Sequence, residues 1–549
     1  MRFKFSSIFL SDGINYFDDQ PLTSTLKFLN FSKTEGLNEI GKYVGQEMME
    51  DVVFLDHFAK PELQMWGVLD DRIDSIWISR THSLMIDRLL DLNVVNSIYS
   101  GDLMYHFISG YLISDAGLFC TLTLTAQTLY GLSKYGNAKT SKYLKSYAED
   151  GWLGATYYTE IQGGSDLGAN TTLATKKGDH FVLNGENKYF ASNAGLADGA
   201  IVTARTENSV NGAKGISAFF VPAVRDDGSK NYELRRIKDK LGTILVPTGE
   251  VLLKDSEGFL LGKEGEGIYV ALEILEVSRI DDAISAVGIA RKALWEAYLY
   301  SKRREAFGRK IYDHPLIRRD LVEMEAEVEA SMVLSLIAGN AFKDASNLRP
   351  PYDSSYHVAR ALTHLAKNMC SWSSDYVTRY SMEILGGKGF LKEFPMEKFH
   401  RDSIVTSMWE GTSNIQALDF LEILSKKHSE KALFELADNL ISSISGNHKE
   451  LARRAYSLLK MRFLEYLSSG NAEYFAKDIL NVFANTLALL YLILIGEKQT
   501  NDGMLAAAEV FYYRHFADHF PPDFDFQAHS ACLEWMGYAP SRRILGQNS

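Results

Sequence analysis

Cysteine is scarce in this chain of 549 residues, and its three copies, Cys120, Cys370 and Cys532, are far apart. No C-x-x-C spacing occurs, which excludes a disulfide framework and gives no sign of a cysteine-based zinc site. A second pattern that could suggest a metal, His357 and His364 on one helix, has no further ligand beside it, so we expect no metal. A reducing cytoplasm is the compartment that we expect.

Long apolar runs are also missing. The most apolar stretch, residues 482–496, contains Asn485 and is shorter than the roughly twenty residues that span a bilayer. We expect this stretch to form a buried helix, with no membrane span. Residues 1–13 have no apolar core long enough for a signal peptide.

Positive charge is not in excess either. The 58 Lys and Arg face 70 Asp and Glu, for a net charge of −12. General nucleic-acid binders need surplus cations to neutralise phosphates, so this balance argues against that class and leaves only a local basic patch open. The 46% hydrophobic content is that of an ordinary globular protein, and the length predicts several domains.

A carboxylate stands out among the residues that are present. Residues 382–390 read MEILGGKGF and residues 409–414 read WEGTSN. Glu410 precedes a turn that opens a helix, where Ser413 would be the cap and Gln416 its capping-box partner. A carboxyl among apolar groups has a raised pKa and can act as a base near neutral pH. Without further motifs, the commoner explanation is a carboxylate favoured by the helix dipole.

A second informative stretch lies in a region with strand-like composition. Residues 159–166 read TEIQGGSD, and their hydroxyl groups and flexible Gly-Gly suit a flat, hydrogen-bonding ligand. A tight turn closed by Asp166 is the plainer alternative. Further along, Asn184-Gly185 separates two strand-like runs and predicts a β-hairpin.

These stretches occur in order with residues 184–193 (NGENKYFASN), Ser278-Arg279 in a long helical pattern, and residues 303–309 (RREAFGR). The ordered set closely resembles the acyl-CoA dehydrogenase family of flavoproteins, over roughly residues 100–425. Within that family the sequence most resembles the AidB-like branch of the adaptive response to alkylation. The segments shared with that branch are 163–166, 170–172, 238–242, 265–268 and the extension after residue 425.

The resemblance implies an α+β multidomain fold. We expect an N-terminal helical domain, a central antiparallel β-barrel or sandwich domain, a C-terminal four-helix bundle and an extra C-terminal helical extension. The helical periodicity and the strand-like runs agree with this order. The corresponding limits are residues 1–150, 151–264, 265–425 and 426–549.

The resemblance also implies FAD as the cofactor, held by residues of two subunits, and hence a homo-oligomer, expected to be a homotetramer. Within one subunit, the implied contacts of the isoalloxazine ring are Thr159, Ser165, Phe190 and, near the flavin N5, Ser192. From a neighbouring subunit, the implied contacts are Arg304 and Phe307 at the pyrophosphate, Glu383, Gly386 and Gly387 along the FAD, and Thr412 and Asn414 at its adenosine half.

The implied activity is α,β-dehydrogenation of an acyl-CoA thioester in fatty acid metabolism. Glu410 would remove the α proton, and a hydride would leave the β carbon for flavin N5. Some family members carry the base at the position of Ser278, which cannot serve here, so Glu410 is the only base that matches either pattern. Arg279 would lie behind Glu410; an ordinary buried ion pair with Asp281 or Asp282 is its alternative. Electrons would pass to an electron-transfer flavoprotein or another acceptor.

Three residues depart from the family pattern. Glu383 replaces the usual Gln at an expected FAD contact, Pro315 replaces a Gln that commonly follows His314, and Phe190 replaces the usual Trp. Two other functions stay open: an acyl-CoA oxidase, and an AidB-like flavoprotein that binds or protects DNA. Residues 425–549 carry 13 Lys and Arg against 14 Asp and Glu, which favours the enzyme. A basic stripe on one helix is nevertheless open, at Lys449, Arg453, Arg454, Lys460 and Arg462, with a solvated face as the commoner meaning.

Overall fold

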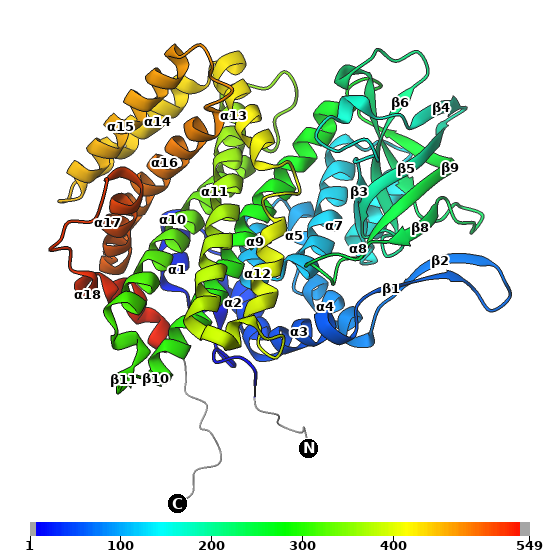
Figure 1. Ribbon diagram of the computed structural model, residues 1–549. Helices are drawn as coiled ribbons and strands as arrows, with labels where there is room; N and C mark the ends of the chain where they lie inside the picture. The colour runs from blue at the N-terminus through cyan, green and yellow to red at the C-terminus, as the bar shows by residue number, and fades with distance from the viewer. Residues whose placement is uncertain (1–6, 539–549) are drawn as a thin grey trace, which may run out of the picture.

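A computed structural model describes residues 7–538 of the chain. Figure 1 shows a β region on one side, long helices in the centre and further helices on the opposite side. The N-terminal elements are α1 (Gln20–Phe28), α2 (Thr34–Tyr43), α3 (Met49–Phe58), β1 (Glu62–Trp66), β2 (Arg72–Trp77), α4 (Arg80–Asp91), α5 (Asn96–Tyr99), α6 (Leu103–Ile113), α7 (Ala116–Tyr135) and α8 (Ser141–Glu149).

Helices α6 and α7 form the centre of the N-terminal region. Every residue of α6 is buried, and nearly all of α7 is buried as well. Helix α7 begins where the Asp115 carboxylate accepts a hydrogen bond from the Leu118 N–H at 2.8 Å, which satisfies a free donor at the helix start. Because α7 contacts both the strand β3 and the long helix α9, it joins the β region to the bundle.

The β region is a seven-stranded sheet that closes on itself. The strands follow the order β3-β6-β4-β5-β9-β7, β7 also pairs with β6, and β8 pairs with β9. The predicted antiparallel barrel is therefore confirmed, although β6 pairs in parallel with β3 and β4. The strands are β3 (Gly154–Tyr157), β4 (Leu173–Lys177), β5 (His180–Ser192), β6 (Gly199–Thr206), β7 (Ile216–Pro222), β8 (Glu233–Ile237) and β9 (Thr248–Leu261).

The hairpin predicted at Asn184-Gly185 is wrong, because β5 runs straight through these residues. The pairing register with β9 shifts on either side of Gly185, so the position is a bulge. A Cβ atom on Gly185 would lie 2.4 Å from the Thr172 hydroxyl. Gly185 is therefore required for close approach of the neighbouring strand and not for a turn.

The central helices form an antiparallel bundle in which α11 contacts both α9 and α10. Helix α9 is buried along nearly its whole length, which explains why its sequence has no polar face. This confirms the predicted bundle and, with the elements on either side of it, the predicted fold class. The elements are α9 (Gly267–Arg303), β10 (Glu305–Ala306), β11 (Arg309–Lys310), α10 (Pro315–Ala345), α11 (Ser354–Leu385), α12 (Met396–Val405) and α13 (Ser413–Lys427).

The helical extension packs directly against the bundle. Helix α16 contacts α10, α11 and α13, and it also contacts α1 at the other end of the chain. It is the one described helix that is long and apolar enough to cross a membrane by composition, but 89% of its apolar window is buried inside the protein, as predicted for a core helix. The extension comprises α14 (Glu430–Ser443), α15 (Lys449–Ser468), α16 (Ala476–Gln499), α17 (Asp502–Phe516) and α18 (Phe526–His529).

Candidate active site

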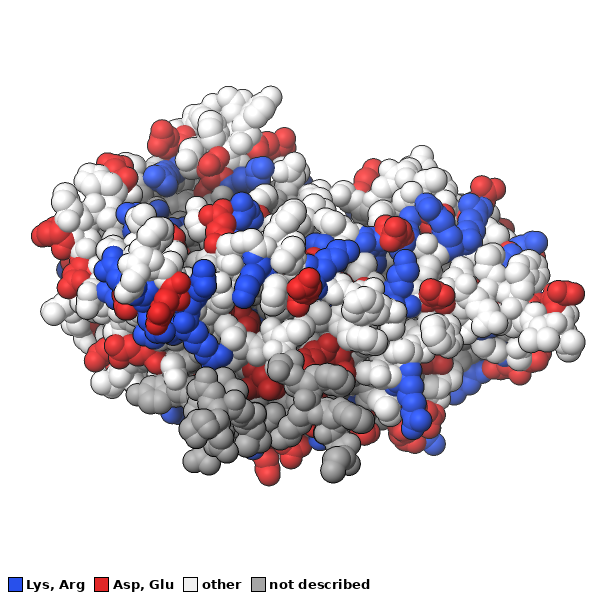
Figure 2. Space-filling model, turned by 60° about the horizontal axis from the view of Figure 1, so that its bottom comes forward, with Lys and Arg blue, Asp and Glu red and all other residues white. Residues whose placement is uncertain are grey.

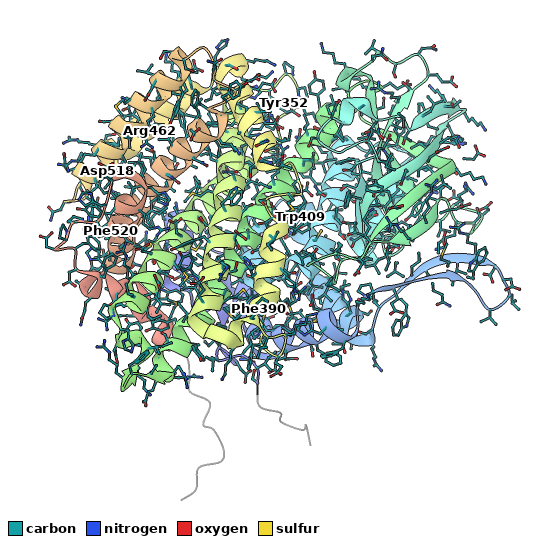
Figure 3. The ribbon with its side chains drawn as sticks, in the orientation of Figure 1. Tyr352, Phe390, Trp409, Arg462, Asp518 and Phe520 are labelled. Atoms are coloured by element: carbon teal, nitrogen blue, oxygen red, sulfur yellow. The ribbon has the colours of Figure 1, made fainter. Side chains whose placement is uncertain are left out.

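Glu410 lies in the short segment between α12 and α13. Its φ is 54° and that of Gly411 is 97°, a left-handed conformation that is costly for a residue with a side chain and that clusters at functional sites. Figure 3 shows the neighbouring Trp409 between the bundle helices and the β region. The chain therefore turns sharply at the residue that carries the candidate base.

The Glu410 side chain and main chain are held by different groups. Ser278 Oγ donates a hydrogen bond to the carboxylate Oε2 at 2.7 Å. The Glu410 carbonyl oxygen accepts from Arg279 Nε at 3.0 Å and from Gln416 Nε2 at 3.1 Å. Helix α9 thus supplies a donor to the carboxylate and, one residue later, a donor to the backbone behind it.

Burial raises the pKa of the Glu410 carboxyl, and the nearby Ser278 hydroxyl and the cations of Arg279 and Lys367 oppose that rise. A carboxyl whose pKa is raised toward neutrality is a stronger base when ionised and can be protonated and deprotonated under ordinary conditions. The raised pKa that the sequence predicts for Glu410 is therefore found, but its neighbours include the Ser278 hydroxyl and buried charges as well as apolar groups.

Arg279 both lies behind Glu410 and forms a buried ion pair, the two roles that the sequence left open. Besides bonding to the Glu410 carbonyl, its guanidinium contacts Glu276 Oε1 at 2.9 Å and Asp419 Oδ2 at 3.3 Å. Its ion-pair partners are thus Glu276 and Asp419, in place of the predicted Asp281 or Asp282. The two carboxylates hold the guanidinium in place, and its Nε donor holds the backbone of residues 409–411, which we call the base segment.

Two buried residues complete this side of the site: Lys367, which the sequence did not single out, and Asp282, which it offered only as an ion-pair partner of Arg279. Lys367 Nζ donates to the Gly411 carbonyl at 3.0 Å and lies 3.5 Å from Asp282 Oδ2. The other oxygen of Asp282 accepts a hydrogen bond from the Trp409 indole N–H. The sequence feature that could have identified them is a charged residue on the buried face of α9 and another on that of α11. Charged residues are rarely buried unless they are paired.

The predicted capping box of α13 is wrong. Thr412 is the N-cap residue and Ser413 is the first helical residue, whose hydroxyl accepts from Trp372 Nε1 at 2.9 Å. Gln416 donates to the carbonyls of Glu410 and Gly411 instead of completing a cap. The Gln416 side chain therefore stabilises the base segment and does not form the local capping motif. Thr412 and Asn414 are both exposed at the start of α13.

The stretch that begins at Thr159 is anchored by a buried ion pair. The Glu160 carboxylate accepts from the Thr171 N–H at 2.7 Å, the Thr172 N–H at 3.1 Å and Lys188 Nζ at 3.0 Å. Burial favours the neutral acid, but Lys188 and these donors keep the pKa of Glu160 well below its usual range. Burial in turn lowers the pKa of Lys188 to about 8. Thr159, the residue before Glu160, is partly exposed, and Ser165 is exposed.

Phe190 and Ser192 lie on β5 beside this stretch. The Phe190 ring is 54% exposed and has Lys238 Nζ 4.7 Å from its centroid, while Ser192 Oγ lies 3.0 Å from Thr248 Oγ1. Glu410 contributes to the rise in the pKa of Tyr158, after burial, which places the base close to this edge of the β region. Tyr158 directly precedes Thr159, so the beginning of this stretch also lies near Glu410.

Of the predicted contacts from a neighbouring subunit, Thr412 and Asn414 lie next to Glu410 at the start of α13, whereas the others lie elsewhere. Phe390, just past the Gly386-Gly387 pair, is at the lower end of the bundle in Figure 3, well away from Trp409, and the β10–β11 hairpin lies at the lower left of Figure 1. Phe307 and Gly308 form its turn with φ of 53° and 78°, the signs of a type I′ turn. Phe307 is 96% exposed, and Arg304 is exposed.

The surface around Gly386 and Gly387 is open. A Cβ atom on either glycine would meet no atom within 4 Å, and the φ of 62° at Gly386 itself favours glycine. Glu383 is exposed and paired with Arg379 at 2.9 Å, so its charge is partly offset. Figure 2 shows Lys and Arg interspersed with Asp and Glu over the lower face, with a denser group of cations on its left half.

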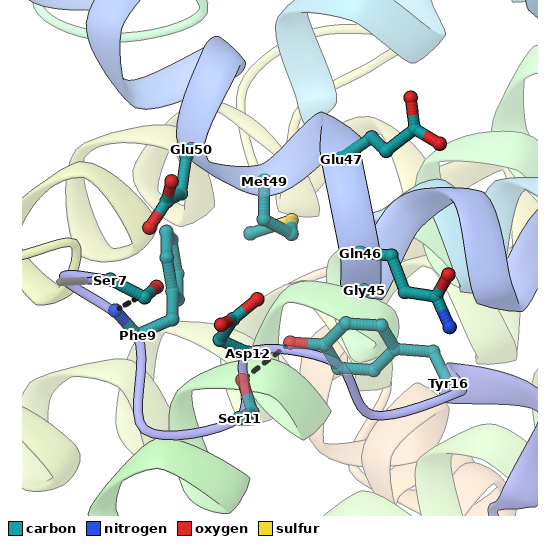
Figure 4. Close-up of a pocket in the computed structure, with 10 residues that line it drawn as sticks. All are labelled: Ser7, Phe9, Ser11, Asp12, Tyr16, Gly45, Gln46, Glu47, Met49 and Glu50. Atoms are coloured by element: carbon teal, nitrogen blue, oxygen red, sulfur yellow. Dashed lines mark hydrogen bonds between the residues drawn. The ribbon is translucent and has the colours of Figure 1, made fainter. Parts of the chain in front are cut away.

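A hollow in the N-terminal region is separate from this site, whereas another hollow, lined by Lys238 and Thr248, adjoins Phe190 and Ser192. Figure 4 shows a small hollow lined by residues from 7–16 and 45–50, none of which belongs to the site. Within residues 7–538, no three His, Cys, Asp or Glu side chains are arranged to hold a metal ion. His364 instead places Nδ1 2.7 Å from Gln416 Oε1 and supports the base segment.

Comparison with known proteins assigns the chain to a family. Residues 155–256 match the middle domain, and residues 265–424 the C-terminal domain, of acyl-CoA dehydrogenases. An acyl-CoA dehydrogenase of Bacillus subtilis strain 168 is 32% identical over 386 residues, which cover 68% of this chain and 97% of that protein. AidB of Escherichia coli K12 is 28% identical over 443 residues, covering 76% of this chain and 78% of AidB.

The fold is similar over almost the whole chain to that of ACDH-11 of Caenorhabditis elegans, solved in complex with C11-CoA. The TM-score is 0.82, with 97% of this chain and 95% of the other covered at 22% identity. At this identity the likeness concerns the fold alone, and it includes the helical extension. With the two matched domains and the Bacillus relative, it follows that the chain belongs to the acyl-CoA dehydrogenase family of flavin-dependent oxidoreductases.

Proposed function

We propose that this protein is an FAD-dependent acyl-CoA dehydrogenase in which Glu410 removes the α proton of the thioester. The observation that carries the proposal is the Glu410 carboxylate: it has a raised pKa, accepts a hydrogen bond from Ser278, and is held in a left-handed conformation beside the β region. An ionised carboxylate in such a site meets the requirements of a general base.

The residues present fit an FAD group. The exposed hydroxyl of Ser165, the half-exposed ring of Phe190 and the hydroxyl of Ser192 supply an aromatic face and hydrogen-bonding groups of the kind that a flavin ring contacts. When bound, FAD supplies the acceptor for the hydride that leaves the β carbon. Glu410 takes the α proton, and the backbone N–H of Glu410 polarises the thioester oxygen, because a weakly acidic α proton needs a stabilised oxyanion. Arg279 keeps the carbonyl of Glu410 turned away from the substrate.

The second group of predicted FAD residues supports an oligomer. Arg304, Phe307, Gly386 and Gly387 lie on the surface at the lower end of the bundle, far from Glu410. A single FAD reaching both groups must therefore lie between two copies of the chain. We propose a homotetramer with FAD sites shared across its interfaces, and an electron-transfer flavoprotein as the acceptor of the electrons.

Anaerobic titration of the purified yellow protein with acyl-CoAs of different lengths tests the proposal. We expect the flavin absorbance to bleach with at least one thioester, and the most effective length identifies the substrate class. Glu410→Gln is isosteric and should retain FAD while abolishing the bleaching. If the variant is still reduced, Glu410 is not the base; if no thioester bleaches the wild type, the protein is not a dehydrogenase.

The alternative, a DNA-binding flavoprotein, gains little from the structure. On α15, Arg454 pairs with Glu450 at 2.9 Å, and Lys460 lies 3.9 Å from Asp438 and 4.0 Å from the Tyr456 ring. Two of the five cations of the stripe, Arg454 and Lys460, are thus already engaged on the helix surface. Salt-sensitive binding of duplex DNA by a protein that no acyl-CoA bleaches would favour this alternative.

A further inference from the structure

Lys367 and Asp282 form a buried ion pair next to the candidate base. Lys367 on α11 is 1% exposed and Asp282 on α9 is 5% exposed, and Nζ and Oδ2 are 3.5 Å apart. Burying two charges is costly unless they are paired and hydrogen-bonded. Such a pair is worth retaining where it sets the geometry or the charge of a neighbouring group.

The pair holds the residue on each side of Glu410. The Trp409 indole N–H donates to Asp282 Oδ1, and Lys367 Nζ donates to the Gly411 carbonyl at 3.0 Å. Glu410 therefore lies between two anchors that belong to one ion pair. This accounts for the persistence of the left-handed backbone at Glu410 and Gly411, which costs free energy unless the surrounding structure fixes it.

We infer that Asp282 and Lys367 are positioning residues for Glu410: they fix the conformation of residues 409–411 and balance the charge beside its carboxylate. The inference rests on the proposed function, in which Glu410 is the base. It assigns a role to two buried charges that are distant in sequence from the base and from each other.

The two members of the pair act on the Glu410 carboxyl with opposite sign. The Lys367 ammonium lowers the pKa of Glu410, whereas a neighbouring carboxylate such as Asp282 raises it. Burial raises the pKa of Asp282 to about 7, against the influence of Lys367 and Trp409. The other polar and charged groups that act on Glu410 are Ser278, Arg279, which is paired with Glu276 and Asp419, and Asp281, which is paired with His106.

Two substitutions at the pair should move the pKa of Glu410 in opposite directions. Asp282→Asn keeps an acceptor for Trp409 but leaves the Lys367 cation unbalanced, so the pKa should fall. Lys367→Met removes the cation, so the pKa should rise. We expect shifts of about one unit, equal to about tenfold in rate on the sloping limb of the pH profile. The double variant removes both charges and should return the pKa toward that of the wild type.

Two measurements on the holoprotein report these shifts. The first is the pH dependence of the rate of anaerobic bleaching by an acyl-CoA. The second is infrared titration of the Glu410 carboxyl without substrate, with the signal assigned by its loss in Glu410→Gln. Because the infrared titration needs no turnover, it tests the inference even if the wild type is not bleached and the proposed function fails.

A matched control is Glu327→Gln, which neutralises a buried carboxylate paired with Arg514 and His515 between α10 and α17. It should lower stability without moving the pKa of Glu410. The inference is overturned if Asp282→Asn and Lys367→Met move the pKa in the same direction or leave it unchanged. It is also overturned if the bleaching rates of the two single variants fall by the same factor at every pH and these factors multiply in the double variant, since that result indicates structural damage alone. If Lys367→Met does not fold, Asp282→Asn and the double variant still decide the question.

Discussion

A single hydroxyl group distinguishes the immediate surroundings of the base. In the family pattern the Ser278 position is the alternative place for the base, and here it carries a residue that donates a hydrogen bond to the Glu410 carboxylate at 2.7 Å. Ser278 is 1% exposed, so water does not readily replace it. Ser278 cannot act as a base, but its hydroxyl lowers the pKa of Glu410, the candidate base.

Replacing Ser278 by Ala should shift the activity to higher pH. The lost bond favours the carboxylate form, and a hydrogen bond to a charged group contributes about 1.5–3 kcal/mol. Its loss raises the pKa of Glu410, so less of the base is ionised below that pKa. We expect bleaching by acyl-CoA to slow about tenfold or more on the acid side of the profile and to recover at alkaline pH. Ser278→Cys, which retains a weak donor, is the control; equal slowing at every pH would contradict this account.

At the residue scale the sequence identified the candidate base, Glu410, but not the residues that hold it. Glu410 and Arg279 stand in recognisable motifs, and the structure brings them together as expected. Lys367 and Asp282 are 85 residues apart and stand in no motif that pairs them. Their role follows only from the packing of α9 against α11. A single sequence does not show which buried charged residues form a pair.

Among the elements, the β10–β11 hairpin has the least expected geometry. Its turn places Phe307 at a φ of 53° and in solvent, at 96% exposure. A type I′ turn prefers Asn or Asp followed by Gly, and the left-handed conformation costs a residue such as Phe about 1–2 kcal/mol. The exposed aromatic ring is thus kept at the expense of local stability, which fits the contact with FAD that the family resemblance implies.

Substituting Phe307 by Asn separates the two contributions. Asn tolerates the turn, so the hairpin should gain about 1 kcal/mol and its amide hydrogens should exchange roughly fivefold more slowly. The flavin-to-protein absorbance ratio after purification should fall, because the ring is lost. Tyr474→Asn, at another exposed aromatic residue on the extension, should leave both measurements unchanged. Full flavin retention in Phe307→Asn would show that the ring does not contact the cofactor.

Elements that depend on local pattern were predicted well, and those that depend on distant neighbours were not. The apolar periodicity predicts helices over residues 356–385, 449–467 and 473–495, and α11, α15 and α16 begin and end close to these limits. At Asn184-Gly185, the local turn signal was misleading, because the chain continues as a strand and Gly185 makes room for Thr172, the residue before β4. At Ser413, the capping motif lost to Gln416 bonding the base segment.

On the scale of the whole molecule, the order of helical, β, bundle and extension regions was readable from the sequence, and the arrangement of subunits was not. Their number, the domain limits and the cytoplasmic location stay predictions. The distance in space between Phe390, beside the Gly386-Gly387 pair, and Trp409, beside Glu410, is the structural reason to expect a shared site, because surfaces that lie apart on one subunit can contact the same FAD across an interface with a second subunit.

Complementation between two defective variants tests the shared site. Phe190→Asp alters the β-region side, where the ring is half-exposed, and Gly387→Trp blocks the bundle side, where a side chain meets no protein atom. Each alone should retain little flavin. Mixed oligomers, isolated by two different tags after co-expression, should recover part of the flavin, because one site then combines two intact halves. Mixed oligomers without flavin would mean that each subunit binds its cofactor alone.

The contact of α1 with α16 has a consequence for how the protein is made. Helix α1 ends at Phe28 and α16 begins at Ala476, so a ribosome adds about 450 residues between them, which takes roughly 20–90 s at about 5–20 residues per second. During this interval the apolar face of the first helix lacks its last partner. The nascent chain therefore exposes this apolar surface until synthesis is nearly complete. We expect its yield in a cell to depend on chaperones that cover the surface.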